Sequence, residues 1–137
     1  MQAFSALAGR VGLSLIFVLS GIAKISAYAG TQQYMAAAGV PGFLLPFVIA
    51  LEVGGGLAIL AGVFTRQAAV ALALFSVASA LLFHANLADQ NQFIHFMKNI
   101  AMTGGLLQVV AFGAGAYSLD RRRVALPARS LQSRPSA

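Results

Sequence analysis

The sequence predicts an all-α integral membrane protein, a four-helix transmembrane bundle with both termini in the cytoplasm. Three observations lead to this prediction: the composition, four long apolar stretches, and the positions of the arginines. Hydrophobic residues make up 59% of the 137 residues and charged residues only 9%, and the mean hydropathy is +0.83. A soluble domain carries about a quarter charged residues, so this composition cannot supply a water-facing surface. We therefore expect one membrane domain over residues 1–120 and a basic, disordered cytoplasmic tail over residues 121–137.

The four apolar stretches each have close to the ~20 residues that an α-helix needs to cross the hydrocarbon core. Helix is the expected structure because strand-like alternation is absent, and because backbone polar groups in lipid must bond within their own segment. Residues 65–67 read as a short hairpin and residues 89–92 as a polar turn. The longer connection at 28–38, with Tyr28 and Tyr34, is compatible with a short helix lying in the membrane interface. The predicted spans are residues 7–27, 42–64, 67–87 and 95–119.

The arginines predict the orientation of the bundle. With four spans, both termini and the hairpin at Arg66 lie on one side, whereas the loops at 28–41 and 88–94 contain no lysine or arginine. Because basic residues concentrate in cytoplasmic loops, both termini are expected inside. A competing interpretation treats the run before Ala27 as a cleaved signal peptide, which would leave three spans, but Lys24 interrupts that pattern. The topology signal consists of Arg66 and the tail residues Arg121, Arg122, Arg123, Arg129 and Arg134.

Several function classes are excluded by what the sequence lacks. The absence of cysteine excludes disulfides, thiolate metal sites and dithiol chemistry. His84 and His95 have no carboxylate cluster around them, so no metal site is expected, and the glycines at 54–56 lack the lysine of a phosphate loop. No nucleophile–base triad is present, and the basic tail lacks the aromatic residues of a nucleic-acid-binding surface. Any chemistry is therefore expected to be proton or electron chemistry on a bound molecule, or to belong to a partner chain.

The most informative single residue is Glu52, which lies about 15 Å along the second span from its start, near the bilayer midplane. A charge at that depth costs roughly 2.5–3.5 kcal/mol on the insertion scale, so it needs partners inside the bundle. The sequence supplies them in the outer half of the protein, where the first helix ends and the fourth begins. We expect Glu52 to face Lys24, Lys98 or both, with His84 and Asn99 as hydrogen-bond partners. The candidate polar pocket consists of Lys24, Glu52, His84, Lys98 and Asn99.

Helical spacing assigns faces to the first two spans. Glu52 shares its face with Gly55, Gly56 and Ile59, while Gly54, Ala58 and Gly62 are predicted to form a ridge of small residues for close helix packing. On the first span, positions separated by three or four residues share one face. They are Arg10, Ser14, Phe17, Gly21, Lys24 and Tyr28.

Two interpretations of the Glu52–lysine pair remain open. A buried ion pair can fix helix register without binding any ligand. Alternatively, ionisable residues inside membranes generally mark functional sites. For His84 taken alone, a solvent-wetted histidine at the interface is the favoured account.

Several blocks of the sequence, in order, resemble the DoxX family of small bacterial inner-membrane proteins. The resemblance covers residues 8–123 and implies a four-helix inner-membrane bundle with both termini inside. It extends to Lys24, Glu52, Arg66, His84, Lys98 and Asn99, whereas Met97 occupies a position that is often tryptophan in the family. The matching blocks are "LSLIFVLSGIAK", "QYMAAAGVP", "LEVGGGLAILAGVFTR", "ALLFHANLADQNQ", "FMKNIAMTGGLL" and "GAGAYSLDRR".

The resemblance implies a link to redox metabolism without assigning a reaction. The family name comes from a subunit associated with a terminal quinol oxidase, and relatives include a subunit of thiosulfate:quinone oxidoreductase. The expected function is therefore a redox-linked membrane subunit whose periplasmic-half pocket holds a quinone headgroup or a small oxidised sulfur anion, with electrons from an oxidoreductase partner. The alternative is a structural or scaffolding subunit, or a small carrier, acting as a homo-oligomer or within a complex. No cofactor carried by this chain is expected beyond such a quinone.

Overall fold

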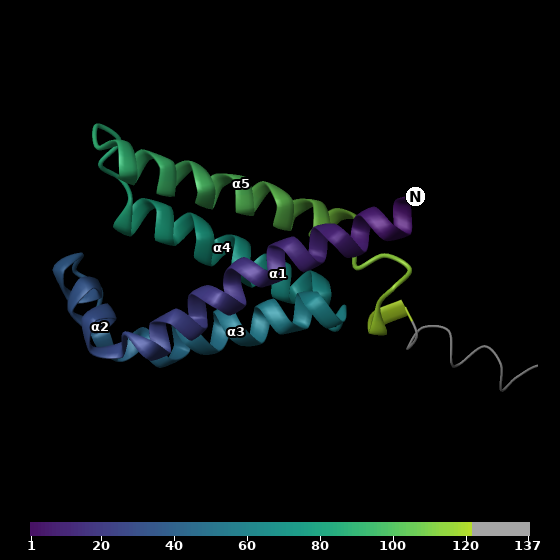
Figure 1. Ribbon diagram of the computed structural model, residues 1–137, viewed down its shortest axis with the longest axis horizontal. Coiled ribbons are helices and arrows are strands. Elements are labelled where there is room, and N and C mark those ends of the chain that lie inside the picture. Colours follow the sequence, from purple (N-terminus) through teal and green to yellow (C-terminus); the bar gives the residue numbers. More distant parts are fainter. Residues whose placement is uncertain (122–137) are drawn as a thin grey trace, which may run out of the picture.

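A computed structural model describes residues 1–121 of the protein as a set of α-helices, with no strand among them (Figure 1). The predicted basic tail, including Arg122 and Arg123, lies outside the described residues; Arg121 is the last of them. The elements are α1 (Gln2–Ser26), α2 (Tyr28–Ala37), the 3₁₀ turn η1 (Gly42–Leu44), α3 (Leu45–Ala61), α4 (Thr65–Phe83) and α5 (Gln90–Phe112).

Three helical segments are long and apolar enough to cross a membrane: Gln2–Ser26, Gly42–Ala61 and Thr65–Phe83. The fourth predicted span corresponds to α5, which has 23 residues but carries several polar side chains in its first three turns. The prediction of membrane-spanning helices is therefore confirmed for three of the four predicted spans. The connection at 28–38 contains the helix α2, as the sequence allowed.

The start of α5 differs from the prediction. Asp89 caps the helix, because its carboxylate accepts a hydrogen bond from the backbone N–H of Gln92 at 2.9 Å. An aspartate in this position satisfies one of the free N–H groups at a helix start. Residues 90–92, predicted as a turn, therefore belong to the helix. The helix α5 also ends earlier than predicted, at Phe112, and is followed by Gly113 with φ of 75°.

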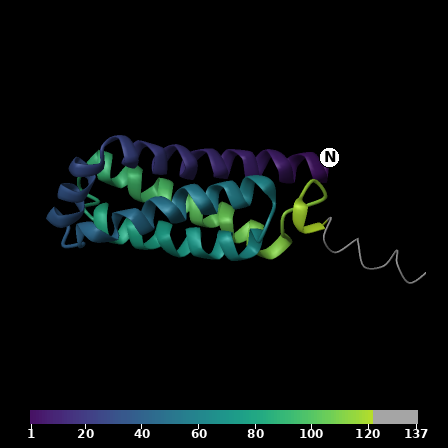
Figure 2. The ribbon, with the colours of Figure 1, turned by 90° about the horizontal axis from the view of Figure 1, so that it is seen from below.

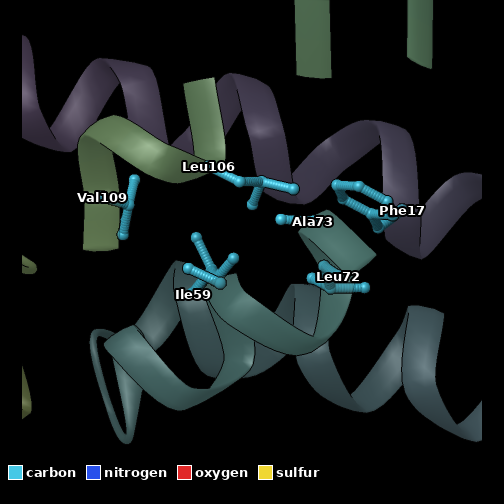
Figure 3. Close-up of a cluster of buried hydrophobic side chains, with 7 residues drawn as sticks. Phe17, Ile59, Leu72, Ala73, Leu106 and Val109 are labelled. Atoms are coloured by element: carbon cyan, nitrogen blue, oxygen red, sulfur yellow. The ribbon is translucent and has the colours of Figure 1, made fainter. Parts of the chain in front are cut away.

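The helices pack as two antiparallel pairs, α1 with α3 and α4 with α5, and α3 also contacts α4. The two pairs lie close together at the end that carries the N-terminus and residues 113–121, and they diverge toward the end that carries α2 (Figure 1). In the view turned by 90°, the long helices run along a common direction, with α2 and the N-terminus at opposite ends (Figure 2). The core lies between the pairs and includes Phe17, Ile59, Leu72 and Leu106 (Figure 3). Ile59, Leu72 and Leu106 have no exposed surface.

Glycines set the distance between α1 and α3, but not the glycines that the sequence suggested. A Cβ atom on Gly56 would lie 2.8 Å from Val18 Cγ2, and one on Gly21 would lie 2.6 Å from Val53 Cγ2. In contrast, a Cβ on Gly54 would meet nothing within 4 Å. The prediction of a packing ridge through Gly54 is wrong, because the face of α3 that carries Glu52 also carries Gly56 and turns Gly54 away.

A second cluster fastens the C-terminal segment to the bundle. Arg10 of α1 is only 2% exposed. It donates one hydrogen bond to the carbonyl of Ile59 at 3.3 Å and another to the carbonyl of Tyr117. Asp120 accepts hydrogen bonds from the backbone N–H groups of Phe64 and Thr65, both at 3.0 Å, and from Thr65 Oγ1 at 2.7 Å. These contacts join α1, the α3–α4 turn and residues 117–120 at one end of the bundle.

Candidate functional site

A cavity of about 400 Å³ is lined by residues of all five α-helices, on the α2 side of the core. This volume lies within the range of small-molecule sites, which are mostly apolar with a few placed polar groups. All five residues of the predicted pocket line it: Lys24, Glu52, His84, Lys98 and Asn99. They come from α1, α3, the end of α4, and α5.

The deepest polar group in the cavity wall is the Glu52 carboxylate, whose residue is only 3% exposed. Lys24 Nζ lies 3.0 Å from Glu52 Oε1 and 2.9 Å from Oε2, so the two residues form an ion pair. Ser20, one turn before Lys24, donates to Glu52 Oε1 at 3.1 Å and accepts from Lys24 Nζ at 2.7 Å. Lys24, Glu52 and Ser20 therefore form a hydrogen-bonded triad between α1 and α3. This triad explains how α3 tolerates a carboxylate among apolar residues.

A second polar group lies where α4 ends and α5 begins. The rings of His84 and His95 stack with centroids 5.0 Å apart. His84 Nδ1 lies 2.8 Å from Gln92 Oε1, and Lys98 Nζ lies 3.2 Å from His95 Nδ1. Lys98 therefore contacts a histidine of its own helix, and its ammonium keeps further protons for other acceptors.

Asn99 is the buried polar residue of α5 in this cavity and is 7% exposed. Its Nδ2 donates to the backbone carbonyl of His95 at 2.9 Å. The next turn is linked in the same way, because Thr103 Oγ1 donates to the carbonyl of Asn99 at 2.9 Å. Asn99 Oδ1 has no hydrogen-bond donor among residues 1–121.

The remaining wall of the cavity is apolar and aromatic. Tyr34 of α2 stacks on Phe83 of α4 with ring centroids 5.4 Å apart, and both residues line the cavity. Phe17, Phe75 and Met102 line it between the helix pairs. The cavity thus offers flat apolar surfaces to a ring and polar groups to its substituents.

The structure places the predicted residues around one cavity, yet it does not give all of the predicted contacts. Glu52 pairs with Lys24, while Lys98, His84 and Asn99 form no hydrogen bond to it. Helical spacing predicts only that these residues lie on one side of the bundle, whereas the neighbour that each side chain contacts depends on its rotamer.

Sequence reasoning missed two participants, Ser20 and Gln92. Ser20 stands four residues before Lys24, which is the spacing of neighbours on one helix face, so its place beside the ion pair could have been inferred. Gln92 was assigned to a turn, and its contact with His84 exists only because α5 begins earlier.

The cavity carries an excess of positive charge. Within the described lining, Lys24 and Lys98 face one carboxylate, Glu52. Charges act more strongly in an apolar surrounding than in water. Such a site suits a molecule with an apolar body and electron-rich oxygen atoms.

The fold and site define a multi-pass helical membrane protein with a largely apolar cavity inside its bundle, lined by a few polar side chains. The DoxX family model matches residues 5–85, and the chain belongs to the DoxX family. It is similar to the inner membrane protein YqjF of Escherichia coli, with 51% identity over 84% of this chain and 88% of that protein. It is also similar to the inner membrane protein YphA of the same organism, with 36% identity over 85% of this chain and 88% of the relative.

These relatives and the three apolar helices place the chain in the bacterial inner membrane. A more distant relative is the Bacillus subtilis protein named "Putative oxidoreductase CatD", with 34% identity over 47% of this chain and 48% of that protein. No solved structure matches the chain.

Proposed function

We propose that the chain is a redox-linked subunit of the inner membrane whose cavity binds the headgroup of a quinone. The observation that carries the proposal is the cavity itself, where three helices and the end of α4 bring Lys24, Glu52, His84, Lys98 and Asn99 around one apolar space. The printed name of the Bacillus subtilis relative supports a redox association.

The proposal includes a topology of four spans, with both termini in the cytoplasm and the cavity in the periplasmic half. Two facts support it. The helix α5 has 23 residues, enough to cross the hydrocarbon core, and packs along α4. Arg66 and Arg121 lie at the end of the bundle opposite α2, while the sequence has no lysine or arginine in 28–41 or 88–94.

The residues present fit a quinone headgroup. Such a ring needs flat apolar walls, which Tyr34, Phe83 and Phe75 supply, and hydrogen-bond donors for its oxygen atoms, which the ammonium groups of Lys98 and Lys24 supply. A bound quinone supplies two-electron, two-proton chemistry. In this scheme Lys98 or His84 donates to a ring oxygen, and Glu52 exchanges a proton through Lys24 and Ser20.

Electrons would reach the site from a partner protein, because the sequence has no cysteine and no evident redox centre. The same excess of positive charge would also suit a small oxidised sulfur anion. Either an oxidoreductase chain or a second copy of this chain is a partner consistent with the proposal.

The experiment that tests the proposal is purification from native membranes in a mild detergent, followed by mass spectrometry of co-purifying proteins and bound quinone. We expect quinone and an oxidoreductase in stoichiometric amounts, and a loss of quinone in the Glu52→Gln variant. A well-folded Glu52→Gln protein with full quinone occupancy and full partner activity would remove the proton role from Glu52.

A structural role is the second candidate, and one observation favours it: Lys24, Glu52 and Ser20 already bind one another through hydrogen bonds. If the triad only sets helix register, replacing Glu52 and Lys24 together by Gln and Met should preserve assembly. Replacing Glu52 alone should be worse, because it leaves a lysine without its counter-charge. A double variant that assembles but binds no quinone would favour the redox role.

A further inference from the structure

The amide of Asn99 has a defined orientation in the cavity wall. Its nitrogen Nδ2 faces the backbone carbonyl of His95 at 2.9 Å. A carbonyl oxygen can only accept a hydrogen bond, so the nitrogen, and not the oxygen, of the amide must face it. The oxygen Oδ1 is therefore fixed as an acceptor pointing away from that carbonyl.

This acceptor is not used by the protein. Asn99 is 7% exposed and lines the cavity, and among residues 1–121 no donor reaches its Oδ1. The oxygen atom is not among the fully buried side-chain atoms that lack a hydrogen bond, so it is open to the cavity that Asn99 lines. An acceptor held in a fixed position in a cavity wall favours a bound molecule that supplies a hydrogen-bond donor.

Lys24 and Lys98 cannot distinguish the oxidised form of a quinone ligand from its reduced form, the hydroquinone. An ammonium group only donates hydrogen bonds, and the ring oxygens of a quinone and of a hydroquinone both carry lone pairs that accept them. Lys24 and Lys98 can therefore serve either form. A hydrogen-bond acceptor in a fixed position binds the two forms with different affinity, because the hydroquinone carries O–H groups and the quinone has none.

We infer that Asn99 makes the cavity selective for the reduced, hydroxyl-bearing form of its ligand, a hydroquinone or related phenol, over the oxidised quinone. The inference rests on the function proposed above. The ring hydroxyl donates to Asn99 Oδ1, and the oxidised form would place a carbonyl oxygen against it instead. No bond forms or breaks in this step; it is a difference in binding.

The test uses three ligands that share one apolar ring: a short-tail hydroquinone, the corresponding benzoquinone, and the dimethyl ether of the hydroquinone. Their affinities for the full-length protein in lipid nanodiscs are measured by equilibrium dialysis under argon. We expect the hydroquinone to bind at least about tenfold more tightly than the quinone, since one buried hydrogen bond is gained and one repulsive contact avoided. The dimethyl ether, which has no donor, should bind about as weakly as the quinone.

An Asn99→Leu variant should lose the preference, with hydroquinone affinity falling to that of the quinone. Gln108→Leu makes the same change of an amide for a similar apolar side chain on α5, at an exposed position outside the cavity lining, and should keep the preference. A redox titration of the bound couple gives a second measurement, because a tenfold preference raises its two-electron midpoint potential by about 30 mV. If Asn99→Leu does not fold, the three ligands still decide the question in the wild-type protein.

Quinone binding that equals or exceeds hydroquinone binding would overturn the selectivity of Asn99 and leave the proposed function standing. Equal binding of the dimethyl ether and the hydroquinone would overturn it too. If no ligand of the series binds above its partition into lipid, the proposed quinone site fails as well as the inference.

Discussion

The two ends of the bundle use their charged and polar groups in different ways. At the end near the termini, Arg10 donates to carbonyls of α3 and the C-terminal segment, and Asp120 accepts from three donors around Thr65. At the α2 end, Lys98 has a single contact to His95 and Asn99 Oδ1 has none among the described residues. Polar groups whose hydrogen bonds link one element to another stabilise the fold. Polar groups beside a cavity that can still form hydrogen bonds are available to a ligand.

This comparison predicts that substitutions near the termini mainly change stability and that substitutions around the cavity mainly change binding. The largest effect is expected for Arg10→Leu. It removes two charged hydrogen bonds at a residue only 2% exposed, and each such bond contributes about 1.5–3 kcal/mol. We expect the free energy of unfolding to fall by about 3 kcal/mol, measured by thermal unfolding in detergent followed by circular dichroism.

Arg66→Leu serves as the control for Arg10→Leu. Arg66 is exposed at the same end of the bundle and makes one long contact, 3.4 Å, to the carbonyl of Ala111. Its replacement should change stability by no more than about 0.5 kcal/mol. Equal losses for the two variants would show that burial of Arg10 does not hold the termini to the bundle.

The second prediction concerns two glycines that are two residues apart in sequence. Gly56→Ala introduces a Cβ at 2.8 Å from Val18 Cγ2 and 3.2 Å from the carbonyl oxygen of Ser14, so α1 and α3 must separate. Overpacking of this kind costs about 1–3 kcal/mol. Gly54→Ala meets nothing within 4 Å and should be neutral or stabilise the helix by up to about 1 kcal/mol.

Unfolding of the two variants, side by side, checks this prediction. A Gly54→Ala protein that is the less stable of the two would mean that α3 faces α1 with the other side. That result would also move Glu52 away from Lys24, and so remove the triad from the cavity.

The glycines also show how far the sequence alone could go. The faces of α1 and of α3 could be predicted, because residues three or four apart lie together: Arg10, Ser14, Phe17 and Gly21 are all buried, as expected. Spacing places both Gly55 and Gly56 on the face of Glu52, however, and does not say which of the two meets α1; in the structure Gly56 meets α1 and Gly55 meets Leu72 of α4. That choice is set by the partner helix, through the pairing of Glu52 with Lys24.

Some contacts of the polar residues could be predicted from the sequence and others could not. An intramembrane carboxylate with lysines at matching depth predicts an ion pair, and Lys24 supplies it. The hydrogen-bond partners of Arg10 could not be predicted, because they are the backbone carbonyls of Ile59 and Tyr117, and every residue carries a backbone carbonyl whatever its side chain. The early start of α5 had a signal, Asp89 before three polar residues, but a capping aspartate and a turn aspartate look alike without the fold.

A third prediction tests the contacts of Asp120. Thr65 is 1% exposed, and Thr65→Val removes the hydrogen bond from its Oγ1 to Asp120 Oδ2 at 2.7 Å while it keeps both backbone N–H contacts. We expect a loss of about 1.5 kcal/mol, the lower end for a hydrogen bond to a charged group. Thr103→Val, which removes only a bond to a helix carbonyl of Asn99, should lose less than half as much in the same thermal measurement.

The smallest change in stability, and the clearest separation of the two ends, is expected for Lys98→Met. The side chain of Met is similar in length and apolar, and the residue is exposed, with its ammonium 3.2 Å from His95 Nδ1. Surface substitutions of this kind change the free energy of unfolding by no more than about 0.5 kcal/mol, so the unfolding temperature should hardly change. Ligand binding should still weaken, by roughly fivefold to tenfold, because one charged donor leaves an apolar site. Lys98→Arg should restore most of the affinity by returning the charge. If Lys98→Met instead unfolds like Arg10→Leu, the cavity is part of the stabilising core and its polar groups do not form a binding site.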